Sequence, residues 1–499
     1  MKQLIVIYLI CAAVFLPYRG HAQKKVIELD LETAVKLAND SSLSAFRMKN
    51  SYMAGYWEYR SFKARRLPSL TLYMTPLSYN RDYTRRYDSQ QNIDMYRRQQ
   101  SLYSYGNLAV QQNFDLTGGT FFIDSELGYI RNFGDRSYSQ FTSVPVRVGY
   151  RQELFGYNAF KWEKKIAPVK YEKARKELLY QLEQTAETAI GYFFELAMAQ
   201  AEYDLALENL ANSDTLYIIG VEKHKIASIG QADLLTLKLD RVNAQNSLQN
   251  AEINLKRSMF ALAAYLNIDK NRTITLKLPD YPEDVLVAVD EALLFAKENN
   301  PGYLDSEQQV LQSEQSLERT GIESRFNAGV SASIGFNQVA ESFREAYRNP
   351  LQQDIVSLKL SVPLVDWGVR RGRYNMAKSN LNITKLTARE RAIQLEEDVI
   401  MTVGHFTVQQ QLIRSAQEAV ELAKLAYEQT RERFIIGKAD INSLTLSSNR
   451  RQSAQRNYIS ALRNYWQNYF KIRRITLYDF ERRIPLADAF DWSMAGEPQ

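Results

Sequence analysis

The residues whose types could do chemistry are few and isolated in this sequence. It contains three histidines, and His224 and His405 each stand alone in a helical stretch, which is typical of surface or packing positions. No phosphate-binding loop, nucleophile elbow or HExxH motif is present. The acidic residues alternate with Lys and Arg along helices, as on a solvated helix face. We therefore expect no enzyme, no metal site and no cofactor.

One polar pattern occurs twice, 207 residues apart. Gly-x-Ala-Asp begins at Gly230 in KIASIGQADLLTL and at Gly437 in RERFIIGKADINSL. A glycine in the left-handed conformation can end a helix, and an aspartate can cap the next helix by accepting hydrogen bonds from its first free amides. With Asp233 and Asp440, the two stretches predict the tips of two helical hairpins. A helix–helix turn without function is the alternative.

The N-terminal stretch has the pattern of a secretory signal peptide, with Lys2, the apolar run 4–16 and a small-residue cleavage site. The run is too short to span a bilayer as a helix. The single cysteine, Cys11, lies within it, at a position that disfavours lipidation. Without residues 1–22 the net charge falls from +6 to +4, because Lys2 and Arg19 are lost and no acid is. Basic and acidic residues are mixed along the chain, so no nucleic-acid partner is predicted.

Three pairs of segments recur in the same order, which predicts two structural repeats. LETAVKLANDSSL (31–43) is echoed by DEALLFAKENNPGYL (290–304), and RQELFGYNAFKWEKK (151–165) by SVPLVDWGVRRGRYN (361–375). The two Gly-x-Ala-Asp stretches form the third pair. The predicted divisions are a signal peptide at 1–22; a first repeat at 23–280, with strands at about 69–154 and a helical hairpin at 158–266; a second repeat at 281–478, with strands at about 328–364 and a hairpin at 368–476; and a C-terminal tail at 479–499.

The predicted helices are unusually long. No proline lies between Val369 and Phe434, so a helix of about 66 residues would extend about 100 Å at 1.5 Å per residue. Within it an apolar or aromatic residue recurs every seven positions, which is typical of coiled-coil packing. These seam residues are Val399, Phe406, Ile413, Val420, Tyr427 and Phe434. The last helix carries a similar seam from Tyr458 to Ile472.

Four segments alternate apolar and polar residues over about the length that an outer-membrane strand requires. They are 121–129, 144–154, 330–337 and 356–364. The alternation suits a membrane-facing sheet, but it suits a soluble sandwich with one wet face equally well.

The first half contains further strand-like sequence. Segments 69–79 and 105–115 are also predicted to be strands. Residues 80–101, which include five Arg and three Asp, are predicted to form a surface loop.

The order of these elements resembles that of the TolC-like outer-membrane efflux proteins over essentially the whole mature chain. The matching segments are LDLETAVKLA, RRLPSLTL, LFGYNAFKWEKK, PLVDWGVRRGR and RERFIIGKADI. The resemblance implies an α+β membrane protein and a homotrimer. Each chain would give four strands to a shared twelve-stranded outer-membrane β-barrel, continued by a coiled-coil α-helical barrel through the periplasm.

The resemblance also implies a passive exit channel in the outer membrane of a Gram-negative bacterium, in contact with its lipid. The hairpin tips at Gly230, Asp233, Gly437 and Asp440 would dock to a periplasmic adaptor that serves an inner-membrane ABC or RND-type transporter. The strand-to-helix junctions would lie at Gly156, Tyr157, Asp366, Trp367 and Gly368. The alternative is a periplasmic adaptor, which would need only one hairpin and a soluble β-domain.

One departure from the family concerns the periplasmic mouth. In members of the family, acidic residues just past the second tip glycine form a cation-selective ring. The equivalent positions here are Ser443 and Leu446, and Thr236 in the first half, none of which is charged. We therefore expect a weakly selective or apolar constriction at Thr236, Ser443 and Leu446.

Overall fold

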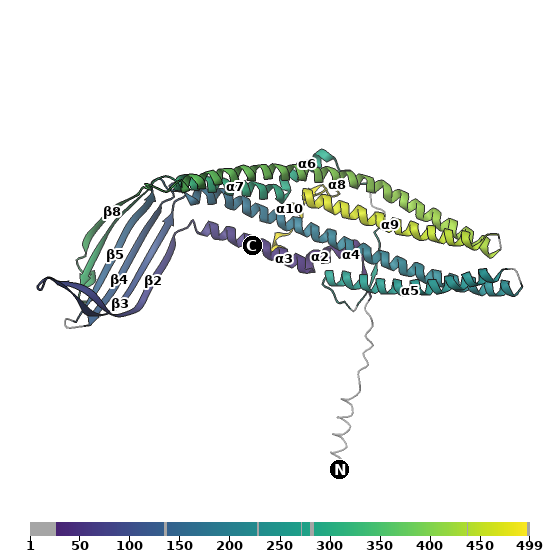
Figure 1. Ribbon diagram of the computed structural model, residues 1–499, viewed down its shortest axis with the longest axis horizontal. Helices are drawn as coiled ribbons and strands as arrows, with labels where there is room; N and C mark the ends of the chain where they lie inside the picture. Colours follow the sequence, from purple (N-terminus) through teal and green to yellow (C-terminus); the bar gives the residue numbers. More distant parts are fainter. Residues whose placement is uncertain are drawn as a thin grey trace, which may run out of the picture.

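The structure, a computed structural model, describes residues 26–133, 137–226, 229–270, 272–279, 284–436 and 438–496. The predicted signal peptide therefore lies outside the described residues. A β-sheet occupies one end of the elongated molecule, and the turns of two long helical hairpins occupy the other (Figure 1). None of the helices within these ranges is both long enough and apolar enough to cross a membrane.

Two helices run the length of the helical part. They are α4 (Ala159–Lys225) and α8 (Val369–Ile435), each of 67 residues and thus about 100 Å long. Helices α5 (Gln231–Tyr265) and α9 (Ile441–Thr476) return beside them over about half that length. The heptad seam of α8 is buried at Val399, Phe406, Ile413, Tyr427 and Phe434, as predicted, while Val420 is half-buried.

Shorter helices complete the half nearer the sheet. Helices α2 (Leu31–Ser41) and α3 (Leu43–Ala64) meet at Ser42, and α6 (Val289–Asn299) and α7 (Pro301–Glu323) meet at Asn300. Each of these two residues ends one helix and caps the next, Ser42 by accepting from the Ala45 amide and Asn300 from the Gly302 amide. The helices form a curved wall in the order α3–α4–α7–α8 near the sheet and α5–α4–α9–α8 near the turns.

The sheet has six antiparallel strands in the order β2–β3–β4–β5–β7–β8. Their bounds are β2 Ser69–Asp88, β3 Ile93–Asn113, β4 Thr120–Phe133, β5 Tyr138–Glu153, β7 Asn327–Ala340 and β8 Leu351–Ser361.

One prediction about the sheet is wrong. Residues 80–101 are not a loop, because β2 and β3 pair from Ser69↔Gln111 to Asp88↔Ile93 and carry the hairpin beyond the rest of the sheet. The six strands include β2 and β3, which contain the predicted strand segments 69–79 and 105–115, whereas the resemblance implies four strands per chain in the shared barrel. Polar composition misled the loop prediction, since a two-stranded ribbon with both faces wet needs no apolar alternation.

The main core lies midway along the wall, where α2 and α6 pack against α4, α8 and α9. It includes fully buried Phe193, Phe406 and Tyr469. A two-stranded parallel sheet of β1 (Val26–Leu29) and β6 (Thr273–Leu276) borders it.

The C-terminal tail folds back onto the wall. It forms β9 (Tyr478–Asp479), β10 (Ile484–Pro485), α10 (Leu486–Ala489) and the short helix η2 (Trp492–Ala495). Leu486 is buried against Leu179 of α4, Ala495 is buried among side chains of α3 and α4, and Trp492 packs on Tyr52.

Candidate functional site

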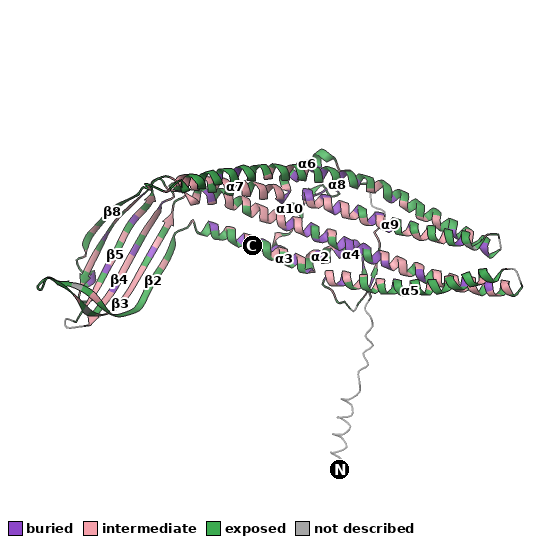
Figure 2. Ribbon diagram, viewed as in Figure 1, coloured by how far each residue is buried: buried purple, intermediate pink, exposed green. Residues whose placement is uncertain are grey.

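The two faces of the sheet differ in chemistry. Paired residues share a face, and the row Leu70–Val110–Ile123–Val148–Ile334 crosses five strands with apolar side chains only. Side chains of this face are exposed on all six strands; Figure 2 marks the exposed residues of the sheet in green. The exposed members include Leu70, Leu72, Met74, Leu108, Ile123, Val148, Ile334, Phe336, Val356, Leu358 and Leu360. An exposed apolar face of this extent suits contact with lipid rather than with water.

The opposite face carries a charged cluster that the sequence analysis did not single out. Arg147 on β5 donates to both carboxylate oxygens of Asp124 and to Glu126 on β4, at 2.5–3.0 Å. Asn107 on β3 donates to the same two carboxylates at 3.2 and 3.1 Å. The alternation of β4 places both acids on the polar side, but only the register between strands shows that Arg147 lies opposite them. A polar lining suits a water-filled interior.

The predicted strand-to-helix junctions lie where the sheet meets the wall. Asp366 accepts from the amides of Gly368 and Arg370, both at 3.1 Å, and these bonds hold the pKa of its carboxyl below the usual value. Trp367 and Gly368 have positive φ values of 55° and 87°, so the chain turns sharply into α8.

The first junction is built differently. The backbone of Gly156 is not left-handed. The hydroxyl of Tyr157 accepts from the Gln315 amide at 2.6 Å, which ties the start of α4 to α7.

The hairpin tips are capped in two different ways. Asp440 is the N-cap of α9, and its side chain accepts from the Ser443 amide at 2.7 Å. The Ser443 hydroxyl and amide hold the pKa of Asp440 below its usual value. Asp233 is not an N-cap. It lies three residues into α5 and accepts from the Gly230 amide at 3.1 Å.

The expectation that Gly230 is left-handed is wrong. Its φ is −77°, because it starts α5 rather than ending α4, and an N-cap residue has an extended backbone. Gly437 lies outside the described residues. Thr236, Ser443 and Leu446 are all exposed on the first two turns of the returning helices. Their place in a constriction therefore stays a prediction.

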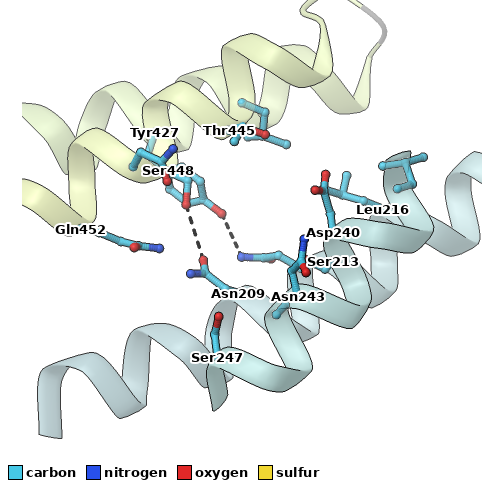
Figure 3. A pocket seen from close by; sticks show the side chains of 15 residues that line it. Asn209, Ser213, Leu216, Asp240, Asn243, Ser247, Tyr427, Thr445, Ser448 and Gln452 are labelled. Carbon is cyan, nitrogen blue, oxygen red and sulfur yellow. Dashed lines mark hydrogen bonds between the residues drawn. The ribbon is translucent and has the colours of Figure 1, made fainter. Parts of the chain in front are cut away.

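Near the tips the two hairpins meet across a polar groove of about 210 Å³ (Figure 3). Asn212 on α4 donates to the hydroxyl of Tyr427 on α8 at 2.9 Å. Arg451 on α9 makes two 3.0 Å bonds to Glu208 on α4. A small apolar cluster beside the groove also joins the hairpins, formed by Tyr427, Phe434 and Leu444 with the half-buried Leu216 and Ala439.

An ion cluster, here called the mid-wall cluster, lies against the main core. Arg473 on α9 donates to Glu183 on α4 at 3.0 Å and lies 3.5 Å from Asp479. Asp479 also accepts from the Tyr469 hydroxyl at 2.8 Å and from the amides of residues 481 and 482. Because the residues come from separate elements, no sequence spacing indicates this cluster.

The pKa values of the two acids in the mid-wall cluster are shifted in opposite directions. Burial raises the pKa of Glu183 in spite of the neighbouring Arg473. Burial also acts to raise the pKa of Asp479, but Arg473, the Arg482 amide and the Tyr469 hydroxyl outweigh it and hold that pKa below its usual value.

Comparison with known proteins gives a consistent result. The sequence model of the family "Outer membrane efflux protein" matches residues 296–476. No curated protein matches.

Solved channels share the fold across nearly the whole chain. The CmeC outer membrane channel of Campylobacter jejuni has 13% sequence identity and a TM-score of 0.64, over 89% of this chain and 85% of that chain. VceC, an outer membrane protein of Vibrio cholerae, has 13% identity and a TM-score of 0.62, over 90% and 95%. The open MtrE outer membrane channel of Neisseria gonorrhoeae has 14% identity and a TM-score of 0.58, over 89% and 88%.

These findings agree with the two-faced sheet and the long helical wall. The predicted outer-membrane location, with a large periplasmic portion, is confirmed. The family resemblance is confirmed as well: residues 296–476 carry the sequence pattern of the outer membrane efflux proteins, and the chain has the fold of the outer-membrane efflux channels.

Proposed function

We propose that the protein is a passive exit channel of the outer membrane. The observation that carries the proposal is the sheet with one exposed apolar face and one polar face, joined directly to a helical wall about 100 Å long. The sheet would cross the outer membrane with its polar face toward the pore, and the wall would extend the pore into the periplasm. The chain would supply no energy, so transport would be driven by a partner.

The working unit in this proposal is a homotrimer built from two repeats per chain. One chain forms only part of a tube, and both borders of its wall carry exposed apolar residues at heptad-like spacing. On α5 these are Leu235, Leu239, Val242, Ile253 and Phe260, and on α8 they are Met376, Ile383, Leu386, Ile393 and Ile400. Seams of this kind suit coiled-coil packing against a neighbouring copy. Three copies would bring α8 of one chain against α5 and α3 of the next.

The two tips would form the contact with a periplasmic adaptor and, through it, an inner-membrane pump of the ABC or RND type. Gly230, Asp233, Gly437 and Asp440 would shape these turns, and helix-in-groove contacts would carry the association. The tips lie together at the end of the molecule farthest from the sheet (Figure 1).

At the mouth, Thr236, Ser443 and Leu446 would form a constriction of weak ion selectivity. Single-channel reversal potentials in a salt gradient test this proposal. A reversal potential near zero is expected, and a strong cation preference would contradict it.

The alternative function is a periplasmic adaptor with a soluble β-domain. Mass measurement of the detergent-extracted protein, together with conductance in planar bilayers, separates the two. A trimer that forms stable conducting pores is expected for the channel. A monomer without conductance would favour the adaptor.

A further inference from the structure

The two edges of the sheet have backbone hydrogen-bonding groups without strand partners. Among the residues that the structure describes, strands β2 and β8 each pair on one side only. Both carry the exposed apolar face, with Leu72 59% exposed on β2 and Leu358 70% exposed on β8. In lipid an unpaired strand edge leaves backbone amides and carbonyls without hydrogen-bond partners, which is strongly unfavourable. Both edges therefore need a strand from elsewhere.

The β2–β3 hairpin is an integral part of the sheet and not an appendage. The β3–β4 ladder runs from Asn113↔Thr120 to Gln100↔Phe133 without a register shift. The apolar face also continues onto the hairpin, since Leu72 pairs with Leu108. The edge that needs a partner is accordingly β2 and not β4.

The register of the sheet has the stagger of a closed barrel. A row of opposed residues can be followed across the sheet by extending the observed strand pairings. The row that starts at Ser361, the last residue of β8, would reach β2 about six residues before Ser69, the first residue of that strand. Six residues correspond to about 20 Å along the strands, and the five steps between strands to about 24 Å across them. If both ends lie level in the membrane, the strands tilt by about 40°, within the range of about 35–45° found in barrels.

We propose, on the basis of the trimer proposed above, that β8 of each chain pairs with β2 of the next copy and that three chains close an eighteen-stranded barrel. The pairing is antiparallel in every case, because each chain supplies an even number of strands and β2 and β8 run in opposite directions. The same stagger continued by one strand places Leu72 opposite about Leu358 of the next copy. Apolar side chains would then face lipid without a break.

The circumference of such a barrel fits the helical tube below it. Eighteen strands tilted by about 40° give about 110 Å. Twelve helices, the α3, α4, α7 and α8 of three copies, give about 110 Å at about 9 Å per helix. Twelve strands at the same tilt would give only about 75 Å. Barrels of 16–18 strands enclose an aqueous channel.

Cysteine cross-linking of the detergent-extracted trimer tests the proposal. The only native cysteine is Cys11, so it is replaced by serine in every variant. Leu72→Cys is combined with Val356→Cys, Leu358→Cys or Leu360→Cys and treated with a short bis-methanethiosulfonate reagent. At least one combination should give covalent dimers and trimers on a denaturing gel. Leu72→Cys with Ser357→Cys or Lys359→Cys, on the opposite face, should give far fewer.

The competing arrangement is a twelve-stranded barrel from which the β2–β3 hairpin is excluded. In that case β4 would be the edge, and Ile123→Cys would cross-link between copies with the same β8 cysteines. That result, or a trimer in which none of the three β2–β8 combinations links, would overturn the eighteen-stranded barrel and leave the channel intact. A monomeric mass would instead overturn the proposed function.

Discussion

Replacing Arg473 with methionine should destabilise the middle of the wall in a strongly pH-dependent way. Arg473 is the cation that the buried Glu183 and Asp479 share, at 3.0 and 3.5 Å. Methionine keeps much of the packing against Phe470, over whose ring the guanidinium lies at 4.7 Å, but it removes the charge. Asp479 keeps its hydrogen bonds from the Tyr469 hydroxyl and two amides. Glu183 keeps no cation, so in the variant it is expected to bind a proton.

That proton limits the cost of the substitution. Protonating a glutamate of ordinary pKa, about 4.3, costs about 3.7 kcal/mol at pH 7 and about 1 kcal/mol at pH 5. The sign follows from linkage. A carboxyl whose pKa is raised in the folded state does not lower the free energy of unfolding below about pH 4.3, where it is protonated in both states. The free energy of unfolding then decreases as the pH rises toward the folded-state pKa. Direct measurements of broken buried pairs, about 3–5 kcal/mol, agree with the value at pH 7.

Hydrogen exchange of peptides from residues 179–196 and 465–476 measures this loss locally, which avoids the assumption of two-state unfolding for a large assembly. Relative to the unsubstituted protein, protection should fall by up to about 500-fold at pH 7 and up to about 5-fold at pH 5, and by less to the extent that the pKa of Glu183 is already raised beside Arg473. The double variant Glu183→Gln/Arg473→Met should lose the part of the pH dependence that Glu183 carries. Arg319→Met, which breaks the exposed pair with Glu323, should change protection by about twofold at either pH. Equal losses at the two pH values for Arg473→Met would refute the reasoning.

Three further substitutions test other parts of the structure. Phe406→Ala removes a fully buried ring between Tyr465 and Tyr469 and should cost about 3–5 kcal/mol, seen as faster exchange in α8 and α9; Val408→Ala, on the exposed side of α8, serves as control. Gly368→Ala forces a Cβ onto a backbone with φ of 87° and should cost about 1–2 kcal/mol; since no atom lies within 4 Å of the added Cβ, a much larger loss of protection at the start of α8 would argue against backbone strain as the cause. Asp440→Ala removes the cap of α9 and should speed exchange at the start of α9 at neutral pH, whereas Asp440→Asn should keep most of the cap. The contacts with Ser443 lower the pKa of Asp440. The difference in exchange rate at the α8–α9 turn between the unsubstituted protein and Asp440→Ala should therefore vanish as the pH falls through that pKa. A difference that persists in acid would contradict this reasoning.

Much of the helical wall could be predicted from local patterns. The seven-residue recurrence of residues such as Phe406 and Ile413 predicted the buried seam of α8, because a helix repeats its face over that interval. Asp440 was predicted as a cap because capping depends on residues within one turn. Gly230 shows the limit of the same reasoning. Glycine is suited both to the end and to the start of a helix, and only the backbone showed which role it has.

Features that depend on register between distant strands could not be predicted. The alternation of β4 predicted that Asp124 lies on the polar face, but it did not identify Arg147 as its partner. A shift of the β4–β5 register by two residues would keep every side chain on the same face, so the alternation alone does not determine the register. The mid-wall cluster likewise requires α4, α9 and the tail to be placed first. Residues 80–101 form a ribbon whose pairing is set by its own turn, and their composition contains no apolar period that could have indicated it.

The pairing of β5 with β7 has a consequence for the order of folding. Glu153 and Gly329 are partners in the sheet although more than 170 residues separate them along the chain. Strands β2 to β5 are close in sequence and can pair soon after they are made, whereas β7 can join them only after the α4–α5 hairpin and helices α6 and α7 have been synthesised. The entropy of closing so long a loop grows slowly with length, but contacts of this separation form late and limit the folding rate. We expect the N-terminal four strands to exist first as an incomplete sheet with β5 as a temporary free edge, which makes this stage the one most exposed to aggregation.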